Sequence, residues 1–147
     1  MQKLKYAFTM IELVFVIVVL GILSMVVIPK LSGVTDDANY TQGMATISSI
    51  RSGVMSERQN NLIKGISSYP TSLDDAAFNT VHEELFDNNI LQYPIYSKSE
   101  SGGWMKTGAT RYNFYMNNST TVQFDYNTTT GRFDCDHSDS NCKDLVE

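Results

Sequence analysis

The stretch FTMIELVFVIVVLGILSMVVIP, residues 8–29, decides the fold of this chain, because it is apolar almost throughout and contains one charged side chain, Glu12. A helix rises about 1.5 Å per residue, so some 20 residues cross the roughly 30 Å hydrocarbon layer of a bilayer. The run therefore predicts a transmembrane helix. A carboxylate near hydrocarbon costs several kcal/mol unless it is paired or close to the interface, so Glu12 requires a partner.

The charges on either side of this run predict its orientation. Lys3 and Lys5 precede it, whereas the single Lys30 that follows is soon balanced by Asp36 and Asp37. The positive-inside rule then places the N-terminus in the cytoplasm and the body of the protein outside.

The run has two simpler interpretations. A cleaved secretory signal has an apolar core of about 7 to 15 residues that ends in small residues, whereas this run is longer and its far end reads SMVVIPKL. A plain uncleaved anchor is the other alternative.

The stretch KYAFTMIEL, residues 5–13, resembles the prepilin-type processing motif of type IV pilins and type II secretion pseudopilins. In that motif a short basic leader ends in a small residue, and Phe, Thr, two apolar residues and Glu follow. The resemblance implies that a membrane aspartyl prepilin peptidase cuts between Ala7 and Phe8 on the cytoplasmic side, and that the new Phe8 amine is methylated. The family usually has Gly before the cut, where this chain has Ala7.

The same resemblance implies three parts: a leader over residues 1–7, a transmembrane and filament-core helix over 8–29, and a periplasmic globular domain over 30–147. Glu12 becomes the fifth residue of the mature chain. Its carboxylate in an incoming subunit would pair with the Phe8 amine of a neighbour, while a pair within one subunit is the alternative, since positions i and i+4 share a helix face.

Gly21 and Pro29 both weaken a helix, Pro29 by removing a hydrogen bond and clashing with the preceding turn. A kink is the ordinary consequence. The resemblance adds that helical order between the two residues is lost when subunits pack in the filament.

About 115 residues follow the run, enough for one compact domain. Apolar residues recur at roughly helical intervals after Pro29 and extend the helix as an amphipathic segment; they are Val34, Ala38, Ala45, Ile47, Ile50, Val54 and Leu62. A variable connector follows, with short helices predicted after Ser72 and over residues 81–91.

The stretch RYNFYMNNSTTVQFDYNTTTGRFDC, residues 111–135, is rich in aromatic and β-branched residues that alternate between two turns. It predicts three antiparallel strands, each with one face toward the helix. The expected class is α+β, with a long N-terminal helix, transmembrane and then amphipathic, packed on a small C-terminal antiparallel sheet. This order is similar to the pilin fold.

The last stretch contains the only two cysteines, Cys135 and Cys142, which an exported location predicts to be disulfide-bonded; two free thiols are the alternative. Asp134, Asp136 and Asp139 offer the oxygen ligands that calcium prefers. Major pseudopilins carry calcium near their C-terminal loops, so the resemblance supports a calcium site here, with a solvated acidic loop as the alternative. No other cofactor is expected.

Chemistry of other kinds has little support in the sequence. The net charge of −5 and scattered basic residues argue against direct nucleic-acid binding. His82 and His137 are not arranged with a nucleophile in any persuasive pattern, so we do not expect an enzyme.

The sequence thus favours a pseudopilin or minor pilin of a type II secretion, type IV pilus or DNA-uptake system. Such a protein lies in the bacterial inner membrane as a single-pass subunit with its globular domain in the periplasm. Its expected partners are other copies or other pilin-like subunits, the prepilin peptidase and the inner-membrane assembly platform. The alternative is a single-pass membrane-anchored extracytoplasmic binding domain.

Overall fold

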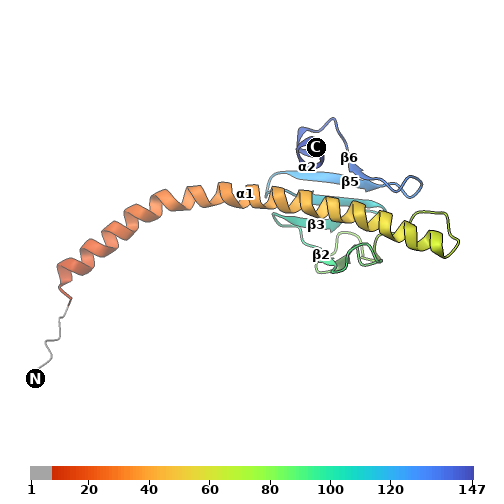
Figure 1. The fold of residues 1–147 in the computed structure, drawn as a ribbon. Helices are drawn as coiled ribbons and strands as arrows, with labels where there is room; N and C mark the ends of the chain where they lie inside the picture. The colour runs from red at the N-terminus through yellow and green to blue at the C-terminus, as the bar shows by residue number, and fades with distance from the viewer. Residues whose placement is uncertain (1–7) are drawn as a thin grey trace, which may run out of the picture. The chain divides into compact units, whose positions relative to one another are not determined.

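The computed structural model describes residues 8–147, apart from the side chains of residues 26–33, so the predicted leader, with Ala7, lies outside it. The elements in chain order are α1 (Met10–Ile63), β1 (Glu84–Leu85), β2 (Ile95–Tyr96), β3 (Gly103–Lys106), β4 (Arg111–Tyr115), β5 (Thr121–Tyr126), β6 (Phe133–Cys135) and α2 (Ser140–Val146) (Figure 1). The chain divides into two units, one ending at Thr35 and the other running from Asp36 to Glu147. The predicted α+β class, a long N-terminal helix followed by a C-terminal antiparallel sheet, is confirmed.

α1 continues through both Gly21 and Pro29 as one helix. The predicted loss of helical order between them concerns packed subunits and stays a prediction. No helix in the described part of the chain combines the length and apolarity that a bilayer crossing requires. The side chains of residues 26–29, the last of the predicted transmembrane span, are not among those that the structure describes.

The C-terminal half of α1 covers the sheet with a narrow stripe of side chains. Ile47, Ile50 and Val54 are buried, as predicted, and Gly43 lies in the same stripe against Phe114. The other apolar residues of the predicted stripe are exposed; they are Val34, Ala38, Ala45 and Leu62. The prediction therefore included too many residues in the buried stripe. An intermittent apolar pattern does not show how few turns of the helix a sheet of short strands can cover.

The C-terminal sheet has four strands in the order β3-β4-β5-β6, all antiparallel. The three predicted strands are β4, β5 and β6, and β5 alternates between exposed and buried residues along its whole length. The fourth strand, β3, was missed because its sequence GWMK is buried at every position and so has no alternation to detect. Trp104 on β3 pairs with Phe114 and is buried.

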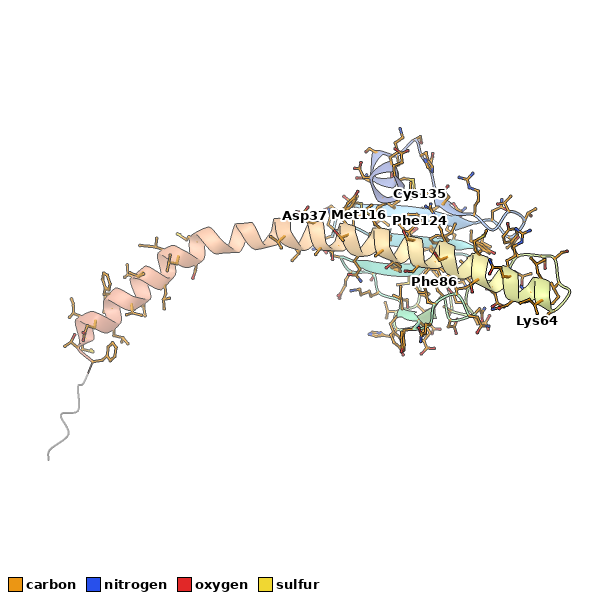
Figure 2. All side chains as sticks on the ribbon, viewed as in Figure 1. Asp37, Lys64, Phe86, Met116, Phe124 and Cys135 are labelled. Carbon is orange, nitrogen blue, oxygen red and sulfur yellow. A yellow bond between two sulfur atoms is a disulfide. The ribbon has the colours of Figure 1, made fainter. Side chains whose placement is uncertain are left out.

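Aromatic rings fill the space between α1 and the sheet. Phe124 and Phe133 stack with centroids 5.3 Å apart, and Trp104 lies 4.9 Å from Phe114. Phe86, which belongs to the connector, meets Trp104 edge-on. Figure 2 places Phe86 and Phe124 among the side chains of this globular unit.

Residues 64–102, which we call the connector, contain no helix, so both short helices predicted there were wrong. The segment predicted to be helical over residues 81–91 instead holds β1, which pairs with β2. His82, Phe86 and Asn89 have φ values near +60°, a left-handed conformation that a right-handed helix excludes. Tertiary contacts, described below, hold the chain in this form.

Gly53 of α1 lies directly against the backbone of the connector. A Cβ built there would lie 1.9 Å from the carbonyl oxygen of Ile90. Gly53→Ala should therefore lower the free energy of unfolding by about 1–3 kcal/mol, even though alanine favours helix, because backbone must move. Urea unfolding of the full chain in detergent, followed by the fluorescence of the single Trp104, measures this. Ser52→Ala, on the exposed side of the same turn, is the control and should change stability by less than about 0.5 kcal/mol. Equal effects of the two substitutions would contradict the close approach.

The C-terminal stretch closes on itself through the predicted disulfide, which is present between Cys135 and Cys142 (Figure 2). The short helix α2, which the sequence analysis did not foresee, begins after Asp139, whose side chain accepts a hydrogen bond from the Asn141 amide. Leu145 of α2 is buried and lies near Gly43 of α1. The disulfide thus fixes the chain end beside the last strand.

Reducing this disulfide should lower the free energy of unfolding by about 2.5 kcal/mol, because the closed loop is short and the chain-entropy model predicts that amount. The measurement compares urea midpoints of the full chain with and without reductant. The Cys135→Ala/Cys142→Ala double variant is the control, because its midpoint should not respond to reductant. An unchanged midpoint in the reduced wild-type chain would show that the crosslink contributes nothing to stability.

Candidate functional site

The N-terminal half of α1 exposes apolar side chains on every side. Each residue from Phe8 to Met25 is exposed, and even the most covered large apolar side chain, Val19, keeps 37% of its surface accessible. An amphipathic helix would bury one stripe and expose polar residues on the other side. This segment has no polar side, so its whole circumference is a candidate contact surface.

Between Phe8 and Met25, the polar side chains of Thr9, Glu12 and Ser24 find their partners at the start of the helix or within it. The Thr9 amide and hydroxyl donate to the Glu12 carboxylate at 2.9 and 2.8 Å, and the Glu12 amide donates back to the Thr9 hydroxyl at 3.3 Å. This is a capping box, which satisfies the free amides of a helix start. The Ser24 hydroxyl donates to the Leu20 carbonyl at 2.7 Å. Hydrocarbon could therefore surround this half without leaving these side chains unpaired.

A capping box at residues 9–12 could have been predicted from the sequence. The pattern Thr-x-x-Glu before an apolar run marks a helix start, and residues 9–12 match it. In the structure the Glu12 carboxylate accepts hydrogen bonds from Thr9. The ion pair between Glu12 and the Phe8 amine concerns the processed and assembled chain and stays a prediction.

The three aspartates of the calcium hypothesis do not converge on a common point. Asp134 accepts hydrogen bonds from Arg51 at 3.0 Å and from Arg132 at 2.6 Å. Asp136 accepts from the Ser138 amide, and Asp139 caps α2. In the described part of the chain, no group of three or more His, Cys, Asp or Glu side chains could hold a metal. The arrangement does not favour calcium, and the calcium hypothesis stays a prediction.

Asp134 is instead the centre of a cluster of cationic groups. Its partial burial raises its pKa, but hydrogen bonds from His137 and Arg132 oppose this. The Cys135 amide and the charge of Arg51 add to the opposition, so the pKa of Asp134 is lowered overall. Asp134 therefore stays ionised and holds the two arginines and His137 beside β6.

A buried ion pair links the connector to β3. The Lys106 ammonium lies 2.7 Å from the Asp74 carboxylate, and both side chains are almost fully buried. The other Asp74 oxygen accepts from the Tyr112 hydroxyl at 2.9 Å and from the Phe86 amide at 3.0 Å. Burial, and then the charge of Asp74, raise the pKa of Tyr112, so its hydroxyl keeps its proton and donates.

The sequence analysis missed this pair because no local pattern joins its members. The residues are 32 positions apart, and Asp74 was assigned to a predicted helix. The Lys106 ammonium, the Asp74 carboxylate, the Tyr112 hydroxyl and the Phe86 amide satisfy one another. This is the arrangement of a structural element and not of a reactive centre.

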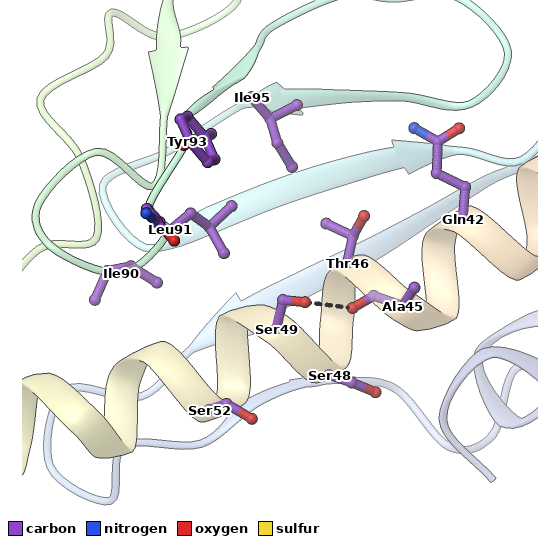
Figure 3. Close-up of a pocket in the computed structure, with 11 residues that line it drawn as sticks. Gln42, Ala45, Thr46, Ser48, Ser49, Ser52, Ile90, Leu91, Tyr93 and Ile95 are labelled. Atoms are coloured by element: carbon purple, nitrogen blue, oxygen red, sulfur yellow. Dashed lines mark hydrogen bonds between the residues drawn. The ribbon is translucent and has the colours of Figure 1, made fainter.

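A shallow groove runs between α1 and the connector (Figure 3). Its α1 side presents small polar residues such as Ser48, Ser49 and Ser52, and its connector side presents Leu91 and other apolar residues. Tyr93 and Ile95 line the connector side, and Tyr93 is 79% exposed. This groove is the candidate site for the alternative function, a binding domain.

The two histidines lie at opposite edges of the sheet. His82 is in the connector, where its amide donates to the Ser97 carbonyl beside β3, and His137 follows β6. The structure therefore does not bring them together into one site.

Comparison of the chain with protein-family models, curated proteins and solved structures found no match.

Proposed function

We propose that this chain is a pseudopilin or minor pilin, a structural subunit that polymerises into the filament of a type II secretion, type IV pilus or DNA-uptake system. The observation that carries the proposal is the segment from Phe8 to Met25, which is exposed on all sides and apolar except for Thr9, Glu12 and Ser24. Such a surface is stable only where lipid or other apolar helices cover it.

A subunit of this kind needs the same helix in two environments. Before assembly, the run from Phe8 to Ile28, long enough in sequence to cross hydrocarbon, would anchor the chain in the bacterial inner membrane with the globular unit in the periplasm. After assembly, the helices of neighbouring copies would replace lipid. The internal hydrogen bonds of Thr9, Glu12 and Ser24 suit both environments, because they leave these polar side chains satisfied.

Glu12 is the residue that we propose joins one subunit to the next. Cleavage after Ala7 by a prepilin peptidase would create a positively charged amine at Phe8, one helical turn from Glu12. In an assembling filament the Glu12 carboxylate would pair with the Phe8 amine of the neighbouring subunit. The assembly platform would then add subunits to the filament one at a time.

Co-expression of the full chain with a prepilin peptidase and an assembly platform tests the proposal. We expect filaments that can be sheared from cells or sedimented, that contain this chain, and that are absent when the peptidase is omitted. A chain that stays dispersed in the membrane with the complete machinery present would contradict the proposal.

A membrane-anchored binding domain is the second candidate, and the groove of Figure 3 is the observation that favours it. Exposed Tyr93 beside small polar residues of α1 offers a flat apolar face next to hydrogen-bonding groups. This candidate gives no role to Glu12 or to the order of residues around Ala7, which is why we place it second.

A further inference from the structure

The turn between β5 and β6 contains an N-glycosylation sequon, the pattern Asn-x-Ser/Thr that marks an acceptor asparagine in an exported protein. Asn127 and Thr129 form the pattern, and Asp125 stands two residues before the asparagine. An acid at that place belongs to the bacterial form of the sequon, where it gives the modifying enzyme a charged group to bind. The proposed function uses none of these residues.

The chain contains four sequons, which begin at Asn39, Asn117, Asn118 and Asn127. Two of them, at Asn39 and Asn127, have an aspartate two residues before the asparagine, whereas the other two have Tyr or Met at that place. Sequence therefore leaves two candidates for modification, and the structure separates them.

The side chain of Asn127 is exposed and only half engaged. Its Oδ1 accepts hydrogen bonds from the Thr129 and Thr130 amides at 2.9 and 3.0 Å, which holds the turn in shape. Among the described residues, neither its Nδ2 nor the Thr129 hydroxyl has a hydrogen-bond partner. The two groups that define a sequon are thus both available to an enzyme. Figure 1 shows this turn at the end of β5, beyond the paired strands.

Asp125 lies on the same outer face of the sheet as Asn127. Side chains alternate along a strand, so residues two apart share a face, and β5 exposes Asp125 on the side away from its buried residues. The Asp125 carboxylate pairs with Arg111 at 3.0 Å, and both side chains are more than half exposed. A pair so exposed is weak, so Asp125 can exchange Arg111 for a cationic group of an enzyme.

Asn39 matches the same five-residue pattern, but the fold occupies its reacting groups. It is half-buried in α1, and its Nδ2 donates to the Ser101 hydroxyl at 2.6 Å and to the Met116 carbonyl at 3.4 Å. The Thr41 hydroxyl of this sequon donates to the Asp37 carbonyl at 3.0 Å. Modifying Asn39 would therefore break contacts that hold α1 against the rest of the globular unit.

We propose that Asn127 is glycosylated on Nδ2 by transfer of a sugar chain from a lipid pyrophosphate carrier, and that the folded chain is not modified at Asn39. Nδ2 forms a bond to the anomeric carbon of the sugar, and the bond from this carbon to the pyrophosphate oxygen breaks, so the electron pair leaves with the carrier. The nitrogen gives one proton to a base of the enzyme. Nothing is oxidised or reduced.

The fold can carry this modification without a change in the turn. The sugar attaches to Nδ2, whereas the hydrogen bonds of the turn end on Oδ1, which keeps its lone pairs. The inference rests on the proposed function in one respect, that the globular unit lies outside the cytoplasm.

Mass spectrometry of the full chain from the membranes of its native host tests the proposal. Trypsin releases residues 31–51, which contain Asn39, and residues 112–132, which contain the other three sequons. Electron-transfer fragmentation leaves a sugar on its side chain and so identifies the modified residue. We expect a glycan on Asn127 and none on Asn39, Asn117 or Asn118. Asn117 is the matched control for the turn, because its Oδ1 accepts from the Ser119 and Thr120 amides in the same way.

Three variants of the full chain in the same host identify the groups that direct the modification. Thr129→Ala should lose the glycan and Thr129→Ser should keep it, because the hydroxyl is the group that the sequon requires. Asp125→Asn, which keeps the size of the side chain and removes its charge, should also lose the glycan. Urea unfolding followed by Trp104 fluorescence confirms that each variant is folded.

An unmodified 112–132 peptide, or a glycan on Asn39, Asn117 or Asn118, would overturn this inference. The same digest reports the N-terminal peptide, so the two proposals fail separately. An unmodified chain that begins at Phe8 would overturn this inference and leave the proposed function standing. A chain that carries the glycan on Asn127 but still begins at Met1 would overturn the proposed function alone.

Discussion

Replacing Asp74 with alanine should lower the free energy of unfolding by about 3–5 kcal/mol, the largest stability effect that we expect from a single substitution in this chain. The change leaves the Lys106 ammonium buried without its counter-charge, and it removes the acceptor of the Tyr112 hydroxyl and the Phe86 amide. Since a small domain is stable by only about 5–15 kcal/mol, this loss is a large fraction of the total stability. Trp104 fluorescence during urea unfolding of the full chain in detergent measures the loss.

Two further variants make this prediction specific to the ion pair. Asp75→Ala removes the adjacent, exposed carboxylate and should change stability by less than about 0.5 kcal/mol. Asp74→Ala combined with Lys106→Met should be less destabilised than the sum of the two single changes, because neither charge is then buried alone. An Asp74→Ala variant as stable as Asp75→Ala would mean that the pair does not hold the connector.

Glu12→Gln should reduce filament incorporation by at least about tenfold while leaving the start of α1 intact. Glutamine can still accept the Thr9 hydrogen bonds of a capping box, so the substitution removes only the charge that would pair with the Phe8 amine. Loss of one partner of a desolvated charge pair costs about 2–5 kcal/mol, more than the 1.4 kcal/mol that a tenfold change requires. The amount of the chain in sheared filaments, relative to the amount in membranes, is the measurement.

Thr9→Ala is the matched control for Glu12→Gln. It removes the helix cap, at about 0.5–2 kcal/mol, but it keeps the charge of Glu12. We expect Thr9→Ala subunits to enter filaments at close to the wild-type level. If both variants fail equally, Glu12 acts through the capping box; if Glu12→Gln enters normally, its charge has no part in assembly.

The elements that could be predicted from the sequence are those with a local periodic signal. Val122, Phe124 and Tyr126 alternate with exposed residues, and β5 has this pattern of burial. The long helix and the two cysteines were likewise assigned correctly. In each case the residues that form the element are neighbours in sequence.

The elements that could not be predicted depend on residues far apart in the chain. Asp74 holds Phe86 and Lys106, and this contact gives the connector its non-helical path although residues 81–91 have a helical appearance in sequence. A glycine inside a helical pattern, such as Gly53, indicates only a weaker helix, whereas the structure places Gly53 directly against the connector backbone at Ile90. Neither the contacts of Asp74 nor the contact at Gly53 can be recognised from a local sequence pattern.

The residues of the candidate site also fall into those that a local motif predicts and those that it does not. Glu12 was identified from a motif of adjacent residues, and its bond to Thr9 could have been predicted from the same residues. The cluster around Asp134 could not, because Arg51 comes from α1 and reaches β6 only in the folded chain. The sequence therefore showed the acids of the C-terminal loop without the arginines that contact Asp134 in the folded chain.

The mass of the mature N-terminus in the native membrane tests the central claim most directly. If this chain is a prepilin-type subunit, its N-terminal peptide begins at Phe8 and carries one methyl group. A peptide that still begins at Met1, or a chain cut beyond Ile28, would contradict the account and favour an anchored or secreted protein instead.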